Sequence, residues 1–208
     1  MTRMGLLSWV TLAIALTSTP ACAQDSTSAP SWTFSASLWG YLVPDQSDYL
    51  QPTFIANYDW LHLEGRYNYE ERNTGSAWVG YNFSFGHDVA FEVTPIVGGV
   101  VGGLTGLGAG YELSVTWWKL ALASDTEYVW DAGDVDGSFL YNWTQIGISP
   151  WPWLEVGLTG QRTRAYQSDR DFQSGFFAAL YWKVWNAGVY VLNPDESPIV
   201  VIATGANF

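Results

Sequence analysis

Charged side chains that could hold or guide a cation recur at every second position in one stretch of the chain. Between Leu61 and Glu70 the alternate positions include His62, Glu64 and Arg66. Successive side chains of an extended strand point to opposite faces, so these groups share one face, opposite a face of leucine and tyrosine. Charges are not stable in a dry core unless they are paired. The stretch therefore predicts a strand with one wet face and one apolar face.

A hairpin further along the chain brings two more carboxylates together. If residues 118–119 form a two-residue turn, Trp117 pairs with Leu120 and Glu112 lies opposite Asp125. Directly opposed residues have Cβ atoms about 4.5–5.5 Å apart, and like charges there destabilise the pair. Such a pair is stable if a cation lies nearby, if one carboxyl stays protonated, or if a basic side chain reaches across.

These charges predict an acidic inner wall. We expect Glu92 and Glu127 on the same wall and at about the same height, with Arg66 as the cation that pairs with them. The arrangement fits a structural ion-pair network and an ion pathway equally well. The candidate residues of the lumen and ion pathway are Glu64, Arg66, Glu92, Glu112, Asp125 and Glu127.

Other chemistry is not predicted. The two histidines, His62 and His87, have no nucleophile at a spacing that suggests catalysis, so the chain is not expected to be an enzyme. Two histidines without a nearby cysteine do not predict a transition-metal site, and no cofactor is expected. The acidic loop 131–137 resembles a calcium loop, but Asn142 stands where the closing carboxylate of an EF-hand would be. The glycine-rich connector 98–106 is not a phosphate loop.

The first residues read as a targeting signal. Arg3 precedes an apolar run from Met4 to Leu16, and 21–23 is a small-x-small cleavage site. We expect residues 1–23 to be a secretory signal peptide and residues 24–208 to be a single domain. The one cysteine, Cys22, would leave with the signal, although a lipoprotein reading of Cys22 is the alternative.

The composition limits the class of protein. The chain has 13 Trp, 12 Tyr and 10 Phe in 208 residues, more than a soluble β-protein of this size usually carries. No later stretch has the roughly twenty apolar residues that a membrane helix needs. The formal net charge of -12 excludes nucleic acid as a partner, because the chain could not neutralise phosphates.

Alternating segments separated by connectors continue to the end of the chain. We expect twelve strands, at 32–42, 50–58, 61–70, 77–85, from 89 to the connector 98–106, and at 107–117, 120–130, 139–148, 154–161, 175–182, 186–192 and 199–208. The register of 139–148 stays open, because apolar residues occupy both faces. Connectors alternate between longer polar or glycine-rich loops and short turns, which is typical of a transmembrane barrel.

The last strand carries a resemblance to a known class. Val200, Ile202, Thr204 and Ala206 alternate toward a terminal Phe208. With the signal peptide and the alternating strands, this resembles the bacterial outer-membrane β-barrel proteins. The resemblance implies an all-β, closed antiparallel transmembrane barrel in the Gram-negative outer membrane. It also implies that Phe208 is an assembly signal for the barrel assembly machinery. Ten strands, or a soluble barrel or sandwich, are the alternative folds.

Three functions follow from that class. The leading hypothesis is a narrow, porin-like passive channel for small polar or cationic solutes. The second is a non-conducting structural or surface-contact barrel, because the inward aromatic residues Trp39, Trp78, Phe177, Tyr181 and Tyr190 could fill the lumen. The third is an outer-membrane enzyme that acts on lipid.

The strand ends predict orientation and lipid contact. We expect the longer loops to face outside and the turns near Trp60, His87 and Trp118 to face the periplasm. Arg162 and Arg164 continue the apolar face of their strand. An outward arginine costs little near the interface, so we expect both to bind lipopolysaccharide phosphates, with pairing to a nearby aspartate as the alternative.

Overall fold

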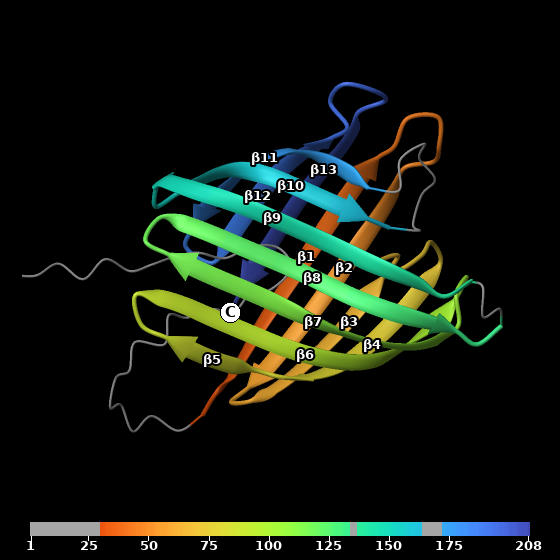
Figure 1. The fold of residues 1–208 in the computed structure, drawn as a ribbon, viewed down its shortest axis with the longest axis horizontal. Coiled ribbons are helices and arrows are strands. Elements are labelled where there is room, and N and C mark those ends of the chain that lie inside the picture. Colours follow the sequence, from red (N-terminus) through yellow and green to blue (C-terminus); the bar gives the residue numbers. More distant parts are fainter. Residues whose placement is uncertain (1–29, 134–136, 164–171) are drawn as a thin grey trace, which may run out of the picture.

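The computed structural model describes residues 30–133, 137–163 and 172–208, and it contains a single sheet of 13 strands (Figure 1). The signal peptide expected at 1–23 lies outside the described residues. The strands are β1 (Trp32–Leu42), β2 (Tyr49–Tyr58), β3 (Leu61–Tyr67), β4 (Thr74–Tyr81), β5 (Phe83–Gly86), β6 (Val89–Gly102), β7 (Gly106–Trp117), β8 (Leu120–Asp131), β9 (Phe139–Trp151), β10 (Leu154–Arg162), β11 (Gln173–Trp182), β12 (Trp185–Leu192) and β13 (Ile199–Asn207). No helix in the described part of the chain is long and apolar enough to span a membrane.

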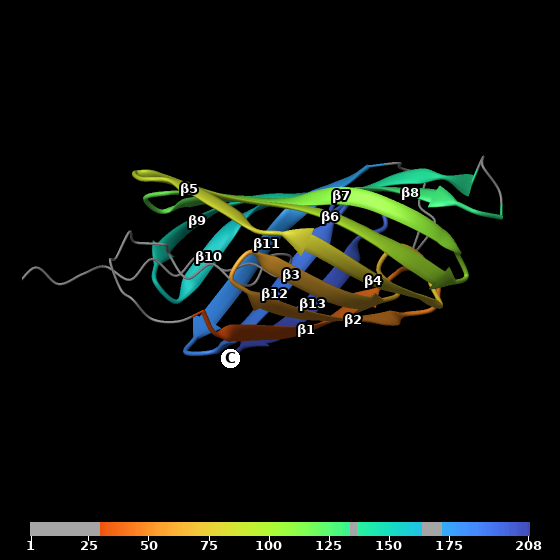
Figure 2. The same ribbon diagram turned by 90° about the horizontal axis from the view of Figure 1, so that it is seen from below.

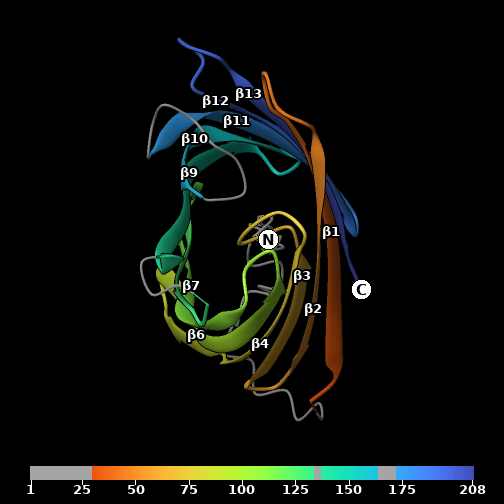
Figure 3. The same cartoon turned by 90° about the vertical axis from the view of Figure 1, so that its right-hand side faces the viewer.

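The sheet closes on itself. Each strand pairs antiparallel with its neighbours, β1 pairs with β13, and β4 pairs with β6. Seen along its length, the sheet forms a closed ring (Figure 3). β4 and β5 pair with β6 in one uninterrupted register, with Gly80 opposite Ile96 and Phe83 opposite Val93. They therefore form one wall strand, which agrees with the single strand predicted at 77–85, and the predicted barrel of twelve strands is confirmed.

The outer surface is apolar over its whole circumference. Exposed side chains include Leu38 on β1, Phe54 on β2, Leu107 on β7 and Ile202 on β13, and Leu107 is 68% exposed. Eight exposed tryptophans lie at the end where the short turns are: Trp32, Trp60, Trp117, Trp118, Trp151, Trp153, Trp182 and Trp185. An apolar band with an aromatic girdle is the outside of a transmembrane barrel. The chain therefore has the fold of an outer-membrane β-barrel.

The two ends of the barrel differ as predicted. Two-residue turns connect β2 to β3, β7 to β8 and β11 to β12, and each begins with a residue of positive φ (Asp59, Trp118 and Lys183). A positive φ at the first turn residue is typical of two-residue hairpin turns whose twist matches the twist of the paired strands. The chain also ends there, because Phe208 exchanges backbone hydrogen bonds with Phe34 of β1. We name this the turn end, and the other the loop end. Figure 2 shows the β5–β6 hairpin extending at the turn end.

The prediction of a glycine-rich connector at 98–106 was wrong. β6 continues through Gly102 and β7 begins at Gly106, so only residues 103–105 connect them. Gly98 of β6 and Gly108 of β7 lie within strands and leave space for a ring. A Cβ on Gly98 would lie 2.6 Å from Cε3 of Trp78, and one on Gly108 would overlap the same ring. The segment forms the wall on which Trp78 lies.

The strand expected at 61–70 is shorter than predicted. β3 ends at Tyr67, because Asn68 adopts a left-handed conformation (φ 58°) that breaks the alternation. Tyr69, predicted to face outward, consequently turns into the barrel and is buried. The open register of 139–148 is also resolved: in β9, Tyr141, Trp143 and Gln145 face inward.

Candidate functional site

Three strands bring the predicted charges together inside the barrel. β3 supplies Glu64 and Arg66, and the β7–β8 hairpin places Glu112 directly opposite Asp125, as its predicted turn requires. Glu127 follows one inward position further along β8. The exposed fractions are 6% for Glu64, 4% for Arg66, 3% for Glu112, and 0% for Asp125 and Glu127. The inward orientation of these five residues is confirmed.

Arg66 is the centre of this group. Its Nη2 donates to Glu64 Oε2 at 2.6 Å and its Nη1 donates to Glu127 Oε2 at 2.8 Å. Longer ion pairs join the guanidinium to Glu112 (3.5 Å), Asp125 (3.7 Å) and Glu70 (3.8 Å). We call Glu64, Glu70, Glu112, Asp125 and Glu127 the acidic cluster.

The acidic cluster carries more negative charge than Arg66 can balance. Five carboxylates share one guanidinium, which leaves four formal negative charges on residues that are all buried. Several of their oxygens have no hydrogen-bond partner among the described residues, including Glu112 Oε1, Asp125 Oδ1 and Glu127 Oε1. Unpaired buried charge is strongly unfavourable. The cluster therefore needs protons or a further cation to be stable.

Two members of the site come from the loop that follows β3. Tyr69 donates its hydroxyl hydrogen to Asp125 Oδ2, and the Arg66 guanidinium lies 4.2 Å from the centre of its ring. Glu70 accepts hydrogen bonds from Ser76 (2.6 Å) and from Trp78 Nε1 (3.2 Å). Burial raises the pKa of the Glu70 carboxyl, although Arg66 acts in the opposite direction. Sequence reasoning missed the role of both residues, and Asn68 was the signal that the strand ended before them.

Glu92 occupies a different level. It lies opposite Ser84 and Ser114, whereas its neighbour two positions on, Thr94, lies opposite Glu112. Glu92 is only half-buried and is nearer the turn end than the acidic cluster. It therefore lines the mouth of the barrel at the turn end, and the prediction that it lies at the height of the other carboxylates was wrong.

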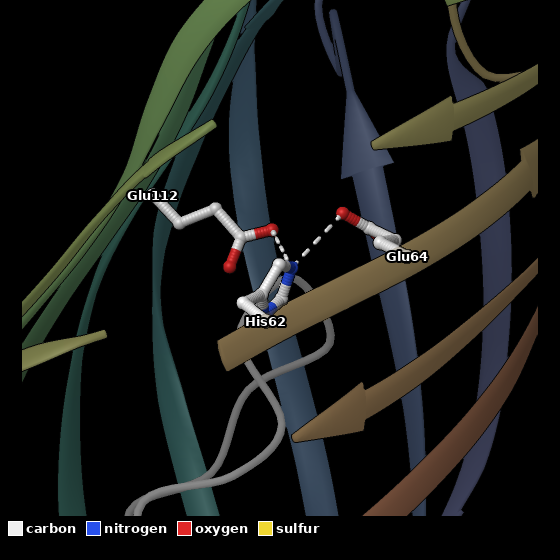
Figure 4. A group of neighbouring side chains, drawn as sticks. All are labelled: His62, Glu64 and Glu112. Carbon is white, nitrogen blue, oxygen red and sulfur yellow. Dashed lines mark ion pairs between the residues drawn. The ribbon is translucent and has the colours of Figure 1, made fainter. Parts of the chain in front are cut away.

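The two histidines have different surroundings. His62 is 2% exposed, and its Nδ1 lies 2.9 Å from Asn57 Oδ1. Its Nε2 points between two members of the acidic cluster, 3.6 Å from Glu64 Oε2 and 3.9 Å from Glu112 Oε1 (Figure 4). His87 is exposed in the turn between β5 and β6. The structure thus forms a group of three potential metal ligands, although the sequence did not predict a metal site.

Aromatic side chains fill the lumen beside the acidic cluster. Trp39 of β1 meets Trp143 of β9 edge to face, with ring centres 5.1 Å apart. Tyr69 lies 4.8 Å from Tyr141, and Tyr190 stacks on Trp39 at 5.0 Å. We call this group the aromatic plug; its members are Trp39, Tyr41, Tyr69, Tyr141, Trp143, Phe177 and Tyr190. The inward positions predicted for Trp39, Trp78, Phe177 and Tyr190 are confirmed, and Tyr181 is half-buried at the edge of the plug.

The remaining predicted sites lie outside the lumen. Arg162 is exposed at the loop end of β10, as expected, whereas Arg164 lies outside the described residues. Phe208 is 66% exposed and stacks on Phe34, with ring centres 6.1 Å apart. In the acidic loop, Asp131 accepts a hydrogen bond from the Gly133 backbone N–H at 2.8 Å, while 134–136 lie outside the described residues.

Comparison with known proteins adds little to this picture. No protein-family model matches the chain, and no curated protein sequence matches it. Among solved structures, the chain is similar to the Acinetobacter baumannii outer membrane protein Omp33. The sequence identity is 11% and the TM-score is 0.44, over 85% of this chain and 97% of that chain. A likeness of this degree carries no argument about function, so the fold rests on strand pairing and on the apolar exterior.

Proposed function

We propose that this chain is a barrel of the bacterial outer membrane whose lumen is closed by packed side chains, so that it serves as a membrane-embedded scaffold and not as an open pore. The apolar exterior and the tryptophan girdle support a location in the membrane, because exposure of so large an apolar surface to water is unfavourable. The closed lumen favours the second function expected from the sequence, a non-conducting barrel, over the narrow channel.

The contact between Trp39 and Trp143 carries the proposal. In the order of the sheet, β1 and β9 are separated by β13, β12, β11 and β10, so the two rings come from facing walls. Neighbouring groups join facing walls in the same way, since Arg66 of β3 bonds to Glu127 of β8. Trp143, Glu127 and Val201 are 0% exposed. A solute would have to displace these side chains in order to pass.

Planar-bilayer recording tests the closure. The native barrel should give no stable conductance steps. Replacing both plug tryptophans, Trp39→Ala with Trp143→Ala, should open a conducting path, because the two largest rings of the plug are lost. The matched control is Trp151→Ala with Trp153→Ala, which removes two exterior rings of the girdle and should leave the barrel closed. Steady conductance of the native protein would overturn the proposal.

A narrow cation channel is the second candidate, and the excess negative charge of the acidic cluster favours it. Rings of carboxylates attract cations and repel anions in pores. If the native barrel conducts, its reversal potential across a salt gradient should show cation preference, most strongly at low salt. Replacing the opposed pair, Glu112→Gln with Asp125→Asn, should reduce that preference. An unchanged preference would remove the acidic cluster from the pathway.

The expected partners complete the proposal. We expect Arg162, which is exposed at the loop end of β10, and Arg164 to bind lipopolysaccharide phosphates, and Phe208 to be the signal for the barrel assembly machinery. Replacing Arg162 and Arg164 with Ala should lower the lipopolysaccharide that co-purifies with the barrel, and unchanged retention would contradict this contact. We assign no catalytic role, because the groups that His62 contacts are an amide and two carboxylates.

A further inference from the structure

We propose that His62, Glu64 and Glu112 form a binding site for a divalent transition-metal ion, of which Zn²⁺ is the best match, inside the barrel. The inference does not depend on whether the lumen conducts. The three side chains come from facing segments of β3 and β7, and one ligand atom of each lies within 4.8 Å of the others. All three are buried, and Figure 4 shows them pointing toward a common centre.

The hydrogen bonds of His62 leave its Nε2 free to bind a metal. Asn57 Oδ1 lies 2.9 Å from His62 Nδ1 and also 2.9 Å from Asn82 Nδ2, which donates to it. An amide oxygen can only accept, so Nδ1 must carry the hydrogen and donate it. In neutral imidazole the other nitrogen then holds a lone pair. His62 Nε2 has no hydrogen-bond partner among the described residues, and it faces the two carboxylates.

An acceptor nitrogen that faces two carboxylate oxygens is unfavourable unless a positive centre lies between them. A proton on Nε2 would bond well to one oxygen at about 2.7–2.9 Å, but the two oxygens lie at 3.6 and 3.9 Å. A metal ion bonds to all three atoms at once. Tetrahedral Zn²⁺ with bonds of about 2.0–2.2 Å has neighbouring ligands about 3.3–3.5 Å apart. His62 Nε2 is within about half an ångström of that spacing from each oxygen, whereas the two carboxylate oxygens, which lie within 4.8 Å of each other, would approach further when the metal binds.

The donor set selects the class of metal. One imidazole nitrogen and two carboxylates suit Zn²⁺ or a similar first-row ion, whereas Ca²⁺ requires six or more oxygen ligands. The groups around the site have the roles of an outer shell. Asn57 holds the imidazole, and Arg66 Nη2 bonds to Glu64 Oε2 at 2.6 Å while lying 3.5 Å from Glu112 Oε1. A dication would also balance half of the four unmatched negative charges of the acidic cluster.

A polar path leads to the site from the turn end. Thr94 donates to Asn82 Oδ1 at 2.8 Å, and Asn82 donates to Asn57, which contacts His62. Asn82 is half-buried, and Ser84 beyond it is exposed. Polar side chains therefore continue from the mouth that Glu92 lines to His62, and the site is nearer to the turn end than to the loop end.

The test is Zn²⁺ binding by the purified full-length barrel in detergent micelles. After treatment with a chelator and equilibration with Zn²⁺ alone, elemental analysis and calorimetry should give one ion per barrel. The variant His62→Gln should lose binding. Asn57→Leu should bind about 10–100-fold more weakly, because loss of an outer-shell partner has that effect on metal affinity. Co²⁺ should give the visible absorption bands of a low-coordinate site, and these should be absent in His62→Gln.

Two matched controls distinguish the site from general attraction to carboxylates. His87→Gln removes the exposed histidine, and Glu92→Gln removes a carboxylate from the mouth; both should bind Zn²⁺ as the native barrel does. Circular dichroism shows whether each variant folds. If His62→Gln does not fold, Asn57→Leu still decides the matter, since its affinity must fall. Sub-stoichiometric Zn²⁺ in the native barrel, or equal affinity in Asn57→Leu and Glu92→Gln, would overturn the proposal.

Discussion

Arg66 forms ion pairs with all five carboxylates of the acidic cluster, and its side chain is fully buried. A buried ion pair adds little stability when it is compared with an apolar pair of similar volume, because both charges must leave water. Removing one partner is different, because the other charge is then buried without compensation. The loss of Arg66 would therefore be costly because it leaves buried carboxylates without a positive partner, and not because any single ion pair is strong.

The variant Arg66→Met tests this asymmetry at the residue scale. It should lower the free energy of unfolding by about 3–5 kcal/mol, measured by urea titration in micelles, because five carboxylates lose their shared partner. Arg162→Met is the control, and this exposed change should stay within about 0.5 kcal/mol. Adding Glu127→Gln to Arg66→Met should recover part of the loss. A cost no larger than that of Arg162→Met would mean that the carboxylates are already neutral.

At the scale of strands, glycines determine how closely an inward side chain can approach the backbone of the barrel wall. Gly98 of β6 and Gly108 of β7 leave the space that the Trp78 ring occupies. The ring in turn donates its Nε1 hydrogen to Glu70. The glycine-rich appearance of this segment therefore reflects packing against a large ring and not a mobile connector.

The variant Gly108→Ala should cost about 1–3 kcal/mol, the usual cost of overpacking, because its Cβ would overlap the Trp78 ring. Gly65→Ala is the matched control: it is also in the wall, but nothing lies within 4 Å of its added Cβ. Gly65→Ala should therefore change the free energy of unfolding by less than about 0.5 kcal/mol. Equal effects of the two variants would show that Trp78 does not need this space.

Alternation along each strand made most of the architecture predictable. It indicated which face is inward, and a two-residue turn then placed Glu112 opposite Asp125 without any structural information. The prediction failed where the backbone left the regular pattern. Asn68 reverses the direction of Tyr69, and no periodicity signals such a change. The group formed by His62 and Glu112 was also out of reach, because it depends on the distance between walls that are far apart in sequence.

At the scale of the whole molecule, alternate residues along each strand face the outside and the inside of the barrel. Apolar side chains face outward, and the inner positions hold the acidic cluster and the aromatic plug side by side. The inner positions alternate with outer ones on every strand, so a one-residue slip of register would bury leucines inside and expose carboxylates to lipid. The closed ring of strand pairs prevents that slip.

The direction of insertion gives the last prediction. Outer-membrane barrels have short periplasmic turns and longer external loops, so we expect the turn end to face the periplasm and the loop end to face the surroundings. The chain offers a clean test, because its one cysteine lies in the expected signal peptide. Thr105→Cys at the loop end and His87→Cys at the turn end are both exposed positions. On intact cells, a membrane-impermeant maleimide should label Thr105→Cys but label His87→Cys only after the outer membrane is permeabilised. The reverse pattern would invert the barrel, and equal labelling of both variants on intact cells would contradict its placement across the membrane.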